Sequence, residues 1–164
     1  MPRLWVLRHA KSSWDDPSLD DRDRPLAPRG RRACEALRRH CAANAVLPEV
    51  VLCSSATRAR ETLEALLGVL GDPEVRVEDG LYLAGAHGWL TRLRGLDAES
   101  ALIVGHNPGL QELVVSLVRP GPLRDRAAAK LPTGALATLE LDEWHELRPG
   151  AADLLDLVTP RELA

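Results

Sequence analysis

The stretch LWVLRHAKSSW, residues 4–14, decides how the chain folds: four apolar residues, Leu4–Leu7, are followed at once by Arg8 and His9. A short apolar run of this kind is typical of a strand that is buried on both faces of a sheet. In open α/β sheets, ligands bind just beyond the carboxyl ends of such strands. A guanidinium can hold a phosphate through two hydrogen bonds, and an imidazole can act as a nucleophile or carry a proton. By itself, the stretch is compatible with a phosphate site and equally with a strand that ends in two polar surface residues.

Two further apolar runs end in polar residues in the same way. Residues 49–55 end in two serines, and residues 101–106 end at His106. A helical pattern of apolar residues follows each run, over residues 56–70 and 110–118. Strands that alternate with helices predict an α/β sandwich with a largely parallel sheet.

The remaining segments continue this alternation. Residues 15–27 are turn-rich and heavily charged, which is typical of a surface loop. The prolines at 120 and 122 are predicted to close the helix over 110–118, and the next element expected after them is a strand at residue 135. The other predicted elements are a helix over 28–45, an edge strand over 75–78, a helix over 87–96, and strands over 135–141 and 152–159.

Composition limits what the protein can be. At 164 residues, with 45% hydrophobic and 27% charged residues, the chain is predicted to form a single domain over residues 1–164. It has no apolar run of the roughly 20 residues that span a bilayer. A net charge of −3 argues against nucleic-acid binding, so any anion site must be a local cluster of cations. Cys34, Cys41 and Cys53 are expected to be buried free thiols, which favours a reducing, cytoplasmic setting. No apolar stripe is left beyond the predicted core faces, and we expect a monomer.

If the three strands are parallel, their carboxyl ends bring several polar groups to one edge of the sheet. Arg8 and His9 would meet His106, with Arg58 from the helix after the second strand. The positive ends of two helices would lie beside them, and such an arrangement suits a dianionic phosphoryl group. Ser12 could add a phosphate contact from the neighbouring loop.

The same residues resemble the motifs of a known family. Leu7-Arg8-His9-Ala10 resembles the Arg-His-Gly motif of the histidine phosphatase superfamily, and residues 54–62 resemble its Ser-x-x-x-Arg-Ala-x-x-Thr motif. Val104-Gly105-His106-Asn107-Pro108 resembles its third motif, and Asp23-Arg24-Pro25-Leu26 with Gly30 fits the segment between the first two. The short length and the Gly-His-Asn-Pro form point to the SixA-type phosphohistidine phosphatases. This resemblance implies a three-layer α/β/α sandwich of the phosphoglycerate mutase-like type, with a mostly parallel, mixed sheet.

The resemblance also implies a mechanism. His9 would attack phosphorus and become a phosphohistidine that water then hydrolyses. Arg8, Arg58 and His106 would bind the phosphoryl oxygens and stabilise their charge, while Ser12 and Asn107 are secondary candidates for substrate contacts. These roles are physically reasonable, because nearby guanidiniums favour a neutral, nucleophilic imidazole and stabilise the phosphoryl group during transfer. No metal or other cofactor is expected, and the aspartates of residues 15–23 are interpreted as a solvated loop without the spacing of a calcium site.

One departure from the family pattern bears on the substrate. Phosphomonoesterases and mutases of this superfamily carry a glutamate that protonates the leaving oxygen, whereas the corresponding position here is Leu83. Glu78 and Asp79 lie nearby but are offset, so either could still serve as that acid. An alkoxide needs a proton to leave, but the imidazole of a phosphohistidine is much less basic. The sequence therefore favours a phosphohistidine substrate.

Three functions follow as hypotheses. The first is a phosphohistidine phosphatase acting on a protein, such as a histidine phosphotransfer domain or a phosphocarrier in signal transduction. The second is a small-molecule phosphomonoesterase of the same superfamily. The third is a non-catalytic module that binds phosphorylated partners. None of the three requires nucleic acid or a membrane.

Overall fold

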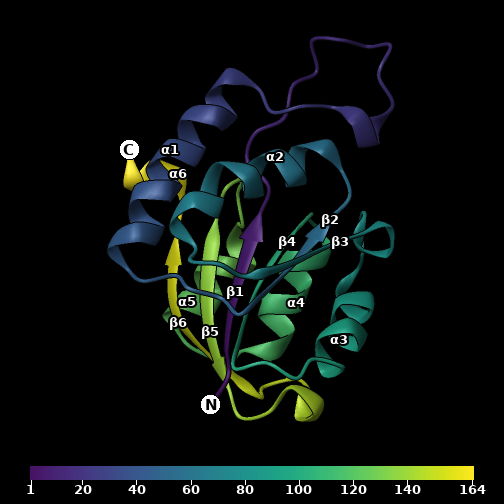
Figure 1. Ribbon diagram of the computed structural model, residues 1–164. Helices are drawn as coiled ribbons and strands as arrows, with labels where there is room; N and C mark the ends of the chain where they lie inside the picture. The colour runs from purple at the N-terminus through teal and green to yellow at the C-terminus, as the bar shows by residue number, and fades with distance from the viewer.

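A six-stranded sheet forms the middle layer of the computed structural model, which describes residues 1–164 (Figure 1). The strand order is β3-β2-β4-β1-β5-β6, and the first four of these strands are parallel to one another. β5 runs antiparallel to both of its neighbours. The predicted mixed, mostly parallel sheet is confirmed, as is the edge position of the strand near residue 75. The strands are β1 (Arg3–Arg8), β2 (Val50–Ser54), β3 (Glu74–Glu78), β4 (Ser100–Gly105), β5 (Leu136–Leu141) and β6 (Ala152–Val158).

Helices cover both faces of the sheet, and the alternation of side chains along β1 supplies an apolar core to each face. Leu4 and Val6 pack into the larger core, beneath α3, α4 and α5. Trp5 and Leu7 pack into the second core, beneath α1 and α2, with Leu163 of α6 against its margin. These two cores make the three layers that the sequence predicted. The helices are α1 (Pro28–Ala43), α2 (Thr57–Leu66), α3 (Ala86–Arg94), α4 (Gly109–Leu117), α5 (Pro122–Ala129) and α6 (Pro160–Leu163).

The structure contains a helix, α5, that the sequence pattern does not predict. The prolines at 120 and 122 indicate only the end of the preceding helix. Proline is equally suited to the first turn of a new helix, where its missing N–H is not needed, and Pro122 is the first residue of α5. Ala127 is the only buried residue of α5, so this helix has no apolar periodicity from which to recognise it.

Parallel pairing places the ends of β1, β2 and β4 at the same level. Arg8 pairs with Gly105, and Cys53 pairs with Val104 one step earlier along β4. Lys11, just after β1, lies against the first turn of α1. Its carbonyl oxygen is so close to Gly30 that a Cβ on that residue would be only 2.1 Å from it. Glycine is therefore required at position 30 for this close approach. None of the helices is long and apolar enough to cross a membrane.

Candidate active site

A cavity of about 240 Å³ opens at the carboxyl ends of β1, β2 and β4. The structure brings together all four of the main predicted residues and both of the secondary ones in its lining. No Asp or Glu is among the eleven lining residues. We call this cavity the catalytic pocket, and its lining consists of Arg8, His9, Lys11, Ser12, Trp14, Arg24, Arg58, Leu83, His106, Asn107 and Thr133.

His9 follows β1 directly and is held by the main-chain carbonyls of two other residues. Its amide donates to the Gly105 carbonyl at 3.1 Å, and its Nδ1 lies 2.7 Å from the Ala10 carbonyl oxygen. Because a carbonyl oxygen only accepts, this contact requires the hydrogen on Nδ1 and leaves a lone pair on Nε2. Burial, together with the charges of Arg58 and Arg8, lowers the pKa of His9 to about 4. His9 is therefore neutral at pH 7, the state that can attack phosphorus.

His106 follows β4, and its ring centroid is 5.2 Å from that of His9. Its Nε2 lies 2.7 Å from the hydroxyl of Ser54, while its Nδ1 is buried without a partner. The Ser54 hydroxyl already accepts a hydrogen bond from the Ala56 amide, so its own hydrogen is available to Nε2. In that arrangement the hydrogen of the neutral ring is on Nδ1 of His106. Burial and the neighbouring His9 lower the pKa of His106 to about 3, so this ring is also neutral.

The two predicted arginines differ in their surroundings. Arg58, in the first turn of α2, is buried, and it donates to the main-chain oxygen of Asp21 at 2.7 Å and to its carboxylate at 3.0 Å. These two contacts occupy two of its five N–H donors. Arg8 donates to the Leu131 carbonyl at 3.0 Å, and its Nε is buried without a partner. Each guanidinium therefore retains donors for an anion in the catalytic pocket.

The secondary candidates, Ser12 and Asn107, also reach the pocket. The Ser12 hydroxyl accepts a hydrogen bond from Arg24. The Asn107 side chain donates to the Leu131 carbonyl at 2.8 Å, which fixes it beside Arg8, and its Oδ1 has no partner. Their positions are compatible with substrate contacts.

Sequence reasoning missed a group of residues from the charged loop before α1. Arg24 is buried, and it donates to the Ser13 carbonyl at 3.0 Å and to the Asp21 carboxylate at 2.9 Å. Its guanidinium lies 3.3 Å from the ring centroid of Trp14, whose ring is largely exposed. Asp21 also accepts from Tyr82, which together with Arg58 and Arg24 lowers the pKa of its carboxyl to about 2. Asp21 was expected to be solvated, but it links this loop to the arginines of the pocket. The only signal in the sequence for the position of Arg24 beside the pocket is the resemblance of its segment to the family pattern.

Glu78 and Asp79, the two candidate acids, lie outside the pocket, whereas Leu83 lines it. Glu78 is held by Arg92 through contacts of 2.9 and 2.8 Å, and Asp79 is exposed and pairs with Arg22. Hydrogen bonds lower the pKa of both carboxyls, from Arg92 for Glu78 and from Ser55 and then Arg22 for Asp79. Both carboxyls are therefore deprotonated at neutral pH, and neither is poised to donate a proton. Leu83 lines the pocket with a left-handed backbone, φ 54°, that leucine rarely adopts.

No group of three or more His, Cys, Asp or Glu side chains in the structure is arranged to hold a metal ion. Among the aspartates of residues 15–23, the Asp16 carboxylate contacts Ser18, and the Asp21 carboxylate contacts Arg24, Arg58 and Tyr82. The cationic side chains that line the pocket are Arg8, Lys11, Arg24 and Arg58.

Comparisons with known proteins agree with this geometry. The model of the histidine phosphatase superfamily (branch 1) matches residues 4–82, the part of the chain that contains His9 and Arg58. An uncharacterised protein of Mycobacterium tuberculosis is 35% identical over 162 residues, covering 94% of this chain and all of its own length.

Two solved structures are similar over almost the whole chain. A SixA protein from Nakamurella multipartitia, described as a candidate phosphohistidine phosphatase, is 30% identical with a TM-score of 0.85, covering 97% of this chain and 96% of its own. A SixA protein from Agrobacterium tumefaciens with the same description is 26% identical, also with a TM-score of 0.85, covering 98% and 99%. The chain belongs to the histidine phosphatase superfamily. Within that superfamily it is of the SixA type, and it is thus a phosphatase with a histidine nucleophile.

Proposed function

We propose that the protein is a phosphohistidine phosphatase and that His9 is its nucleophile. One observation carries the proposal: a neutral histidine with a free Nε2 shares its pocket with arginines and a leucine, and with no carboxyl group. Such a pocket can bind and transfer a phosphoryl group. It offers no side-chain acid for the leaving group, and a phosphohistidine does not require one.

In the first step, the lone pair on Nε2 of His9 forms a bond to phosphorus while the bond from phosphorus to the substrate imidazole breaks. The electron pair of the broken bond stays on the substrate ring, which leaves as neutral imidazole when its other nitrogen carries a hydrogen. In the second step, water attacks phosphorus and the bond to Nε2 breaks. One proton of the water is released, and His9 regains its lone pair.

The surrounding residues stabilise the phosphoryl oxygens during both steps. Arg8 and Arg58 contribute fixed positive charge, and His106, which lines the same pocket, contributes a further contact. Preorganised charge of this kind usually contributes more than any other effect to the catalysis of phosphoryl transfer. We propose that these side chains carry out the transfer without a metal.

The substrate is proposed to be a phosphorylated histidine on a protein, such as a histidine phosphotransfer domain or a phosphocarrier in a signalling pathway. We further propose that the enzyme acts as a monomer of one domain. The three cysteines are free and buried, and burial raises the pKa of each thiol, which suits a protein that works in the reducing cytoplasm.

A substrate panel distinguishes this function from that of a small-molecule phosphomonoesterase. We expect turnover of phosphoramidate and of a phosphohistidine peptide, and a kcat/KM at least a hundredfold lower for sugar phosphates, because general acid catalysis supplies about 10²–10⁴-fold. Faster hydrolysis of sugar phosphates would contradict the proposal. Binding of phosphohistidine peptide without any turnover would instead support a non-catalytic phosphate-binding module.

A further inference from the structure

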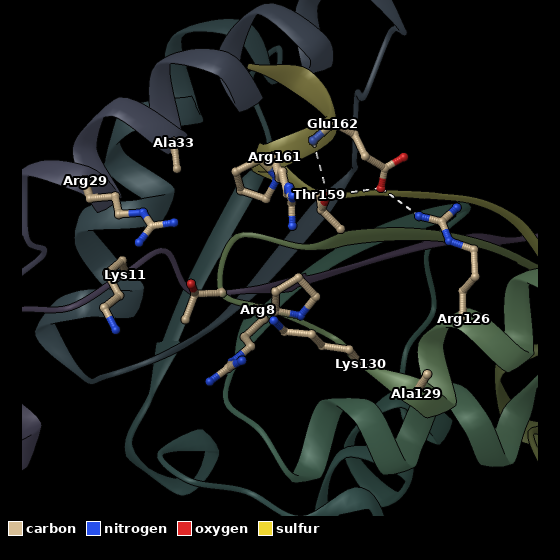
Figure 2. A pocket seen from close by; sticks show the side chains of 13 residues that line it. Arg8, Lys11, Arg29, Ala33, Arg126, Ala129, Lys130, Thr159, Arg161 and Glu162 are labelled. Atoms are coloured by element: carbon tan, nitrogen blue, oxygen red, sulfur yellow. Dashed lines mark hydrogen bonds and ion pairs between the residues drawn. The ribbon is translucent and has the colours of Figure 1, made fainter.

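A second, larger cavity lies beside the catalytic pocket. It has a volume of about 670 Å³ and shares the lining residues Arg8, Lys11 and Thr133 with the pocket, so the two cavities lie side by side. Its walls come from α1, α5, α6 and the segment after α5 (Figure 2). We call it the cationic groove. A protein with its phosphoryl group at His9 would therefore bring the residues that flank its phosphohistidine near this groove.

The groove has a strong excess of positive charge. Its lining contains six cationic side chains and a single acid, Glu162. Glu162 is already paired with Arg126 at 2.6 Å and also contacts the Thr159 hydroxyl. The whole chain carries a net charge of −3, so this excess is local. The cations are Arg8, Lys11, Arg29, Arg126, Lys130 and Arg161.

Five of these six cations take part in none of the ion pairs of the structure: Arg8, Lys11, Arg29, Lys130 and Arg161. Figure 2 shows the charged ends of Arg29, Arg161 and Lys130 pointing toward the open middle of the groove from three different elements. Like charges gathered in this way repel one another, and an anionic ligand relieves that repulsion.

The spacing of the cations indicates what kind of anion the groove fits. All of them except Arg8 are exposed, and they are distributed along the groove, whereas a compact anion such as a single phosphate is typically held by convergent donors. Several separate carboxylates on one polypeptide match the distributed arrangement better.

We propose that the cationic groove binds acidic side chains that flank the phosphohistidine of the protein substrate. This inference rests on the proposed function, since it assumes that the same substrate places its phosphoryl group at His9. Electrostatic attraction of this kind acts mainly on the rate of association, so it raises kcat/KM.

Two synthetic peptides test the proposal. Each carries one phosphohistidine, flanked in one peptide by Asp and Glu and in the other by Asn and Gln. We expect a kcat/KM about tenfold higher for the acidic peptide at low salt, with the difference shrinking as salt is added. Equal kcat/KM for the two peptides would overturn the groove proposal and leave the phosphatase intact. Failure to hydrolyse either peptide would overturn the proposed function itself.

Charge reversal at Lys130 and Arg161 identifies the surface responsible. Neither residue lines the catalytic pocket, and both are exposed, so Lys130→Glu with Arg161→Glu should fold and should hydrolyse phosphoramidate at the wild-type rate. The preference for the acidic peptide should disappear. The matched control is Arg148→Glu, an exposed residue between β5 and β6 at the opposite end of the sheet, which should keep the preference. An unchanged preference in the double variant, or an equal loss in the control, would overturn the proposal. The neutral variants Lys130→Gln and Arg161→Gln should show a smaller loss, and they replace the double variant if it does not fold.

Discussion

At the scale of the residue, the choice of leaving group depends on the absence of a carboxyl group from the lining of the pocket. His9 presents Nε2 as a lone pair because the Ala10 carbonyl holds the hydrogen on Nδ1. Leu83 lines the same pocket, while Glu78 is turned away into its pairing with Arg92. The pocket can therefore transfer a phosphoryl group but offers no side-chain carboxyl to protonate a strongly basic leaving oxygen.

Leu83→Glu tests this account of specificity. The new carboxyl would stand at the pocket wall, where it could protonate an alkoxide leaving group. We expect kcat/KM for an alkyl phosphate to rise by about tenfold or more, since general acids contribute about 10²–10⁴-fold when well placed. Activity should be measured on glycerol phosphate and on phosphoramidate. Leu83→Gln is the matched control, because glutamine has the shape of glutamate but no acidic proton. Equal rates of alkyl phosphate hydrolysis in the two variants would refute the account.

At the scale of the element, one threonine ties α2 to the segment that carries His9. The fully buried Thr62 hydroxyl accepts from the Ala10 amide at 3.0 Å and donates to the Arg58 carbonyl at 2.7 Å. The backbone beside His9, the proposed nucleophile, is thereby joined to the backbone of Arg58. This link joins the helix that follows β2 to the segment that follows β1.

Thr62→Val removes this link while it keeps the size of the side chain. It leaves the buried Ala10 amide without a partner, which costs about 1–3 kcal/mol of the free energy of unfolding. We also expect kcat to fall, because His9 and Arg58 lose their common support. Urea unfolding and phosphoramidate turnover measure the two effects. Thr62→Ser keeps the hydroxyl and should retain most of the activity, and a valine variant with wild-type stability would show that the link is unimportant.

The elements differ in how well the sequence predicts them. β1, β2 and β4 were predictable because a buried parallel strand is a local apolar run, and its end is marked by the first polar residue. α5 was not, because Ala127 alone is buried and the helix has no apolar stripe. The pairing of Asp21 with Arg24 and Arg58 was also beyond reach, since it depends on how a charged loop folds back over α2. Charged loop residues look alike in sequence whether they are solvated or buried.

At the scale of the whole molecule, the two buried histidines couple stability to pH. Folding lowers the pKa of His9 to about 4 and that of His106 to about 3, whereas both titrate near 6.5 in the unfolded chain. As the pH falls below 6.5, the unfolded state binds protons that the folded state does not. The contribution of these two histidines to the free energy of unfolding is therefore fully present above pH 6.5 and is lost progressively as the pH falls below it.

We expect the free energy of unfolding to fall between pH 6.5 and about 5, where shifted carboxyl groups do not yet contribute. The slope approaches about 1.4 kcal/mol per pH unit for each histidine once the unfolded ring is fully protonated. Urea denaturation at a series of pH values measures it. His9→Gln should remove roughly half of the slope. A free energy of unfolding that does not change over this range would contradict the burial of two neutral rings.

The most direct test of the central claim is to trap the phosphoenzyme. The protein is mixed with phosphoramidate, quenched with alkali to preserve phosphohistidine, digested, and analysed by mass spectrometry. We predict one phosphorylated histidine, His9, modified at Nε2, and neither modification nor turnover in His9→Ala. The exposed His145 provides the control, because His145→Ala should be phosphorylated at His9 as the wild type is. Turnover in His9→Ala, or phosphate found on a different residue, would contradict the account.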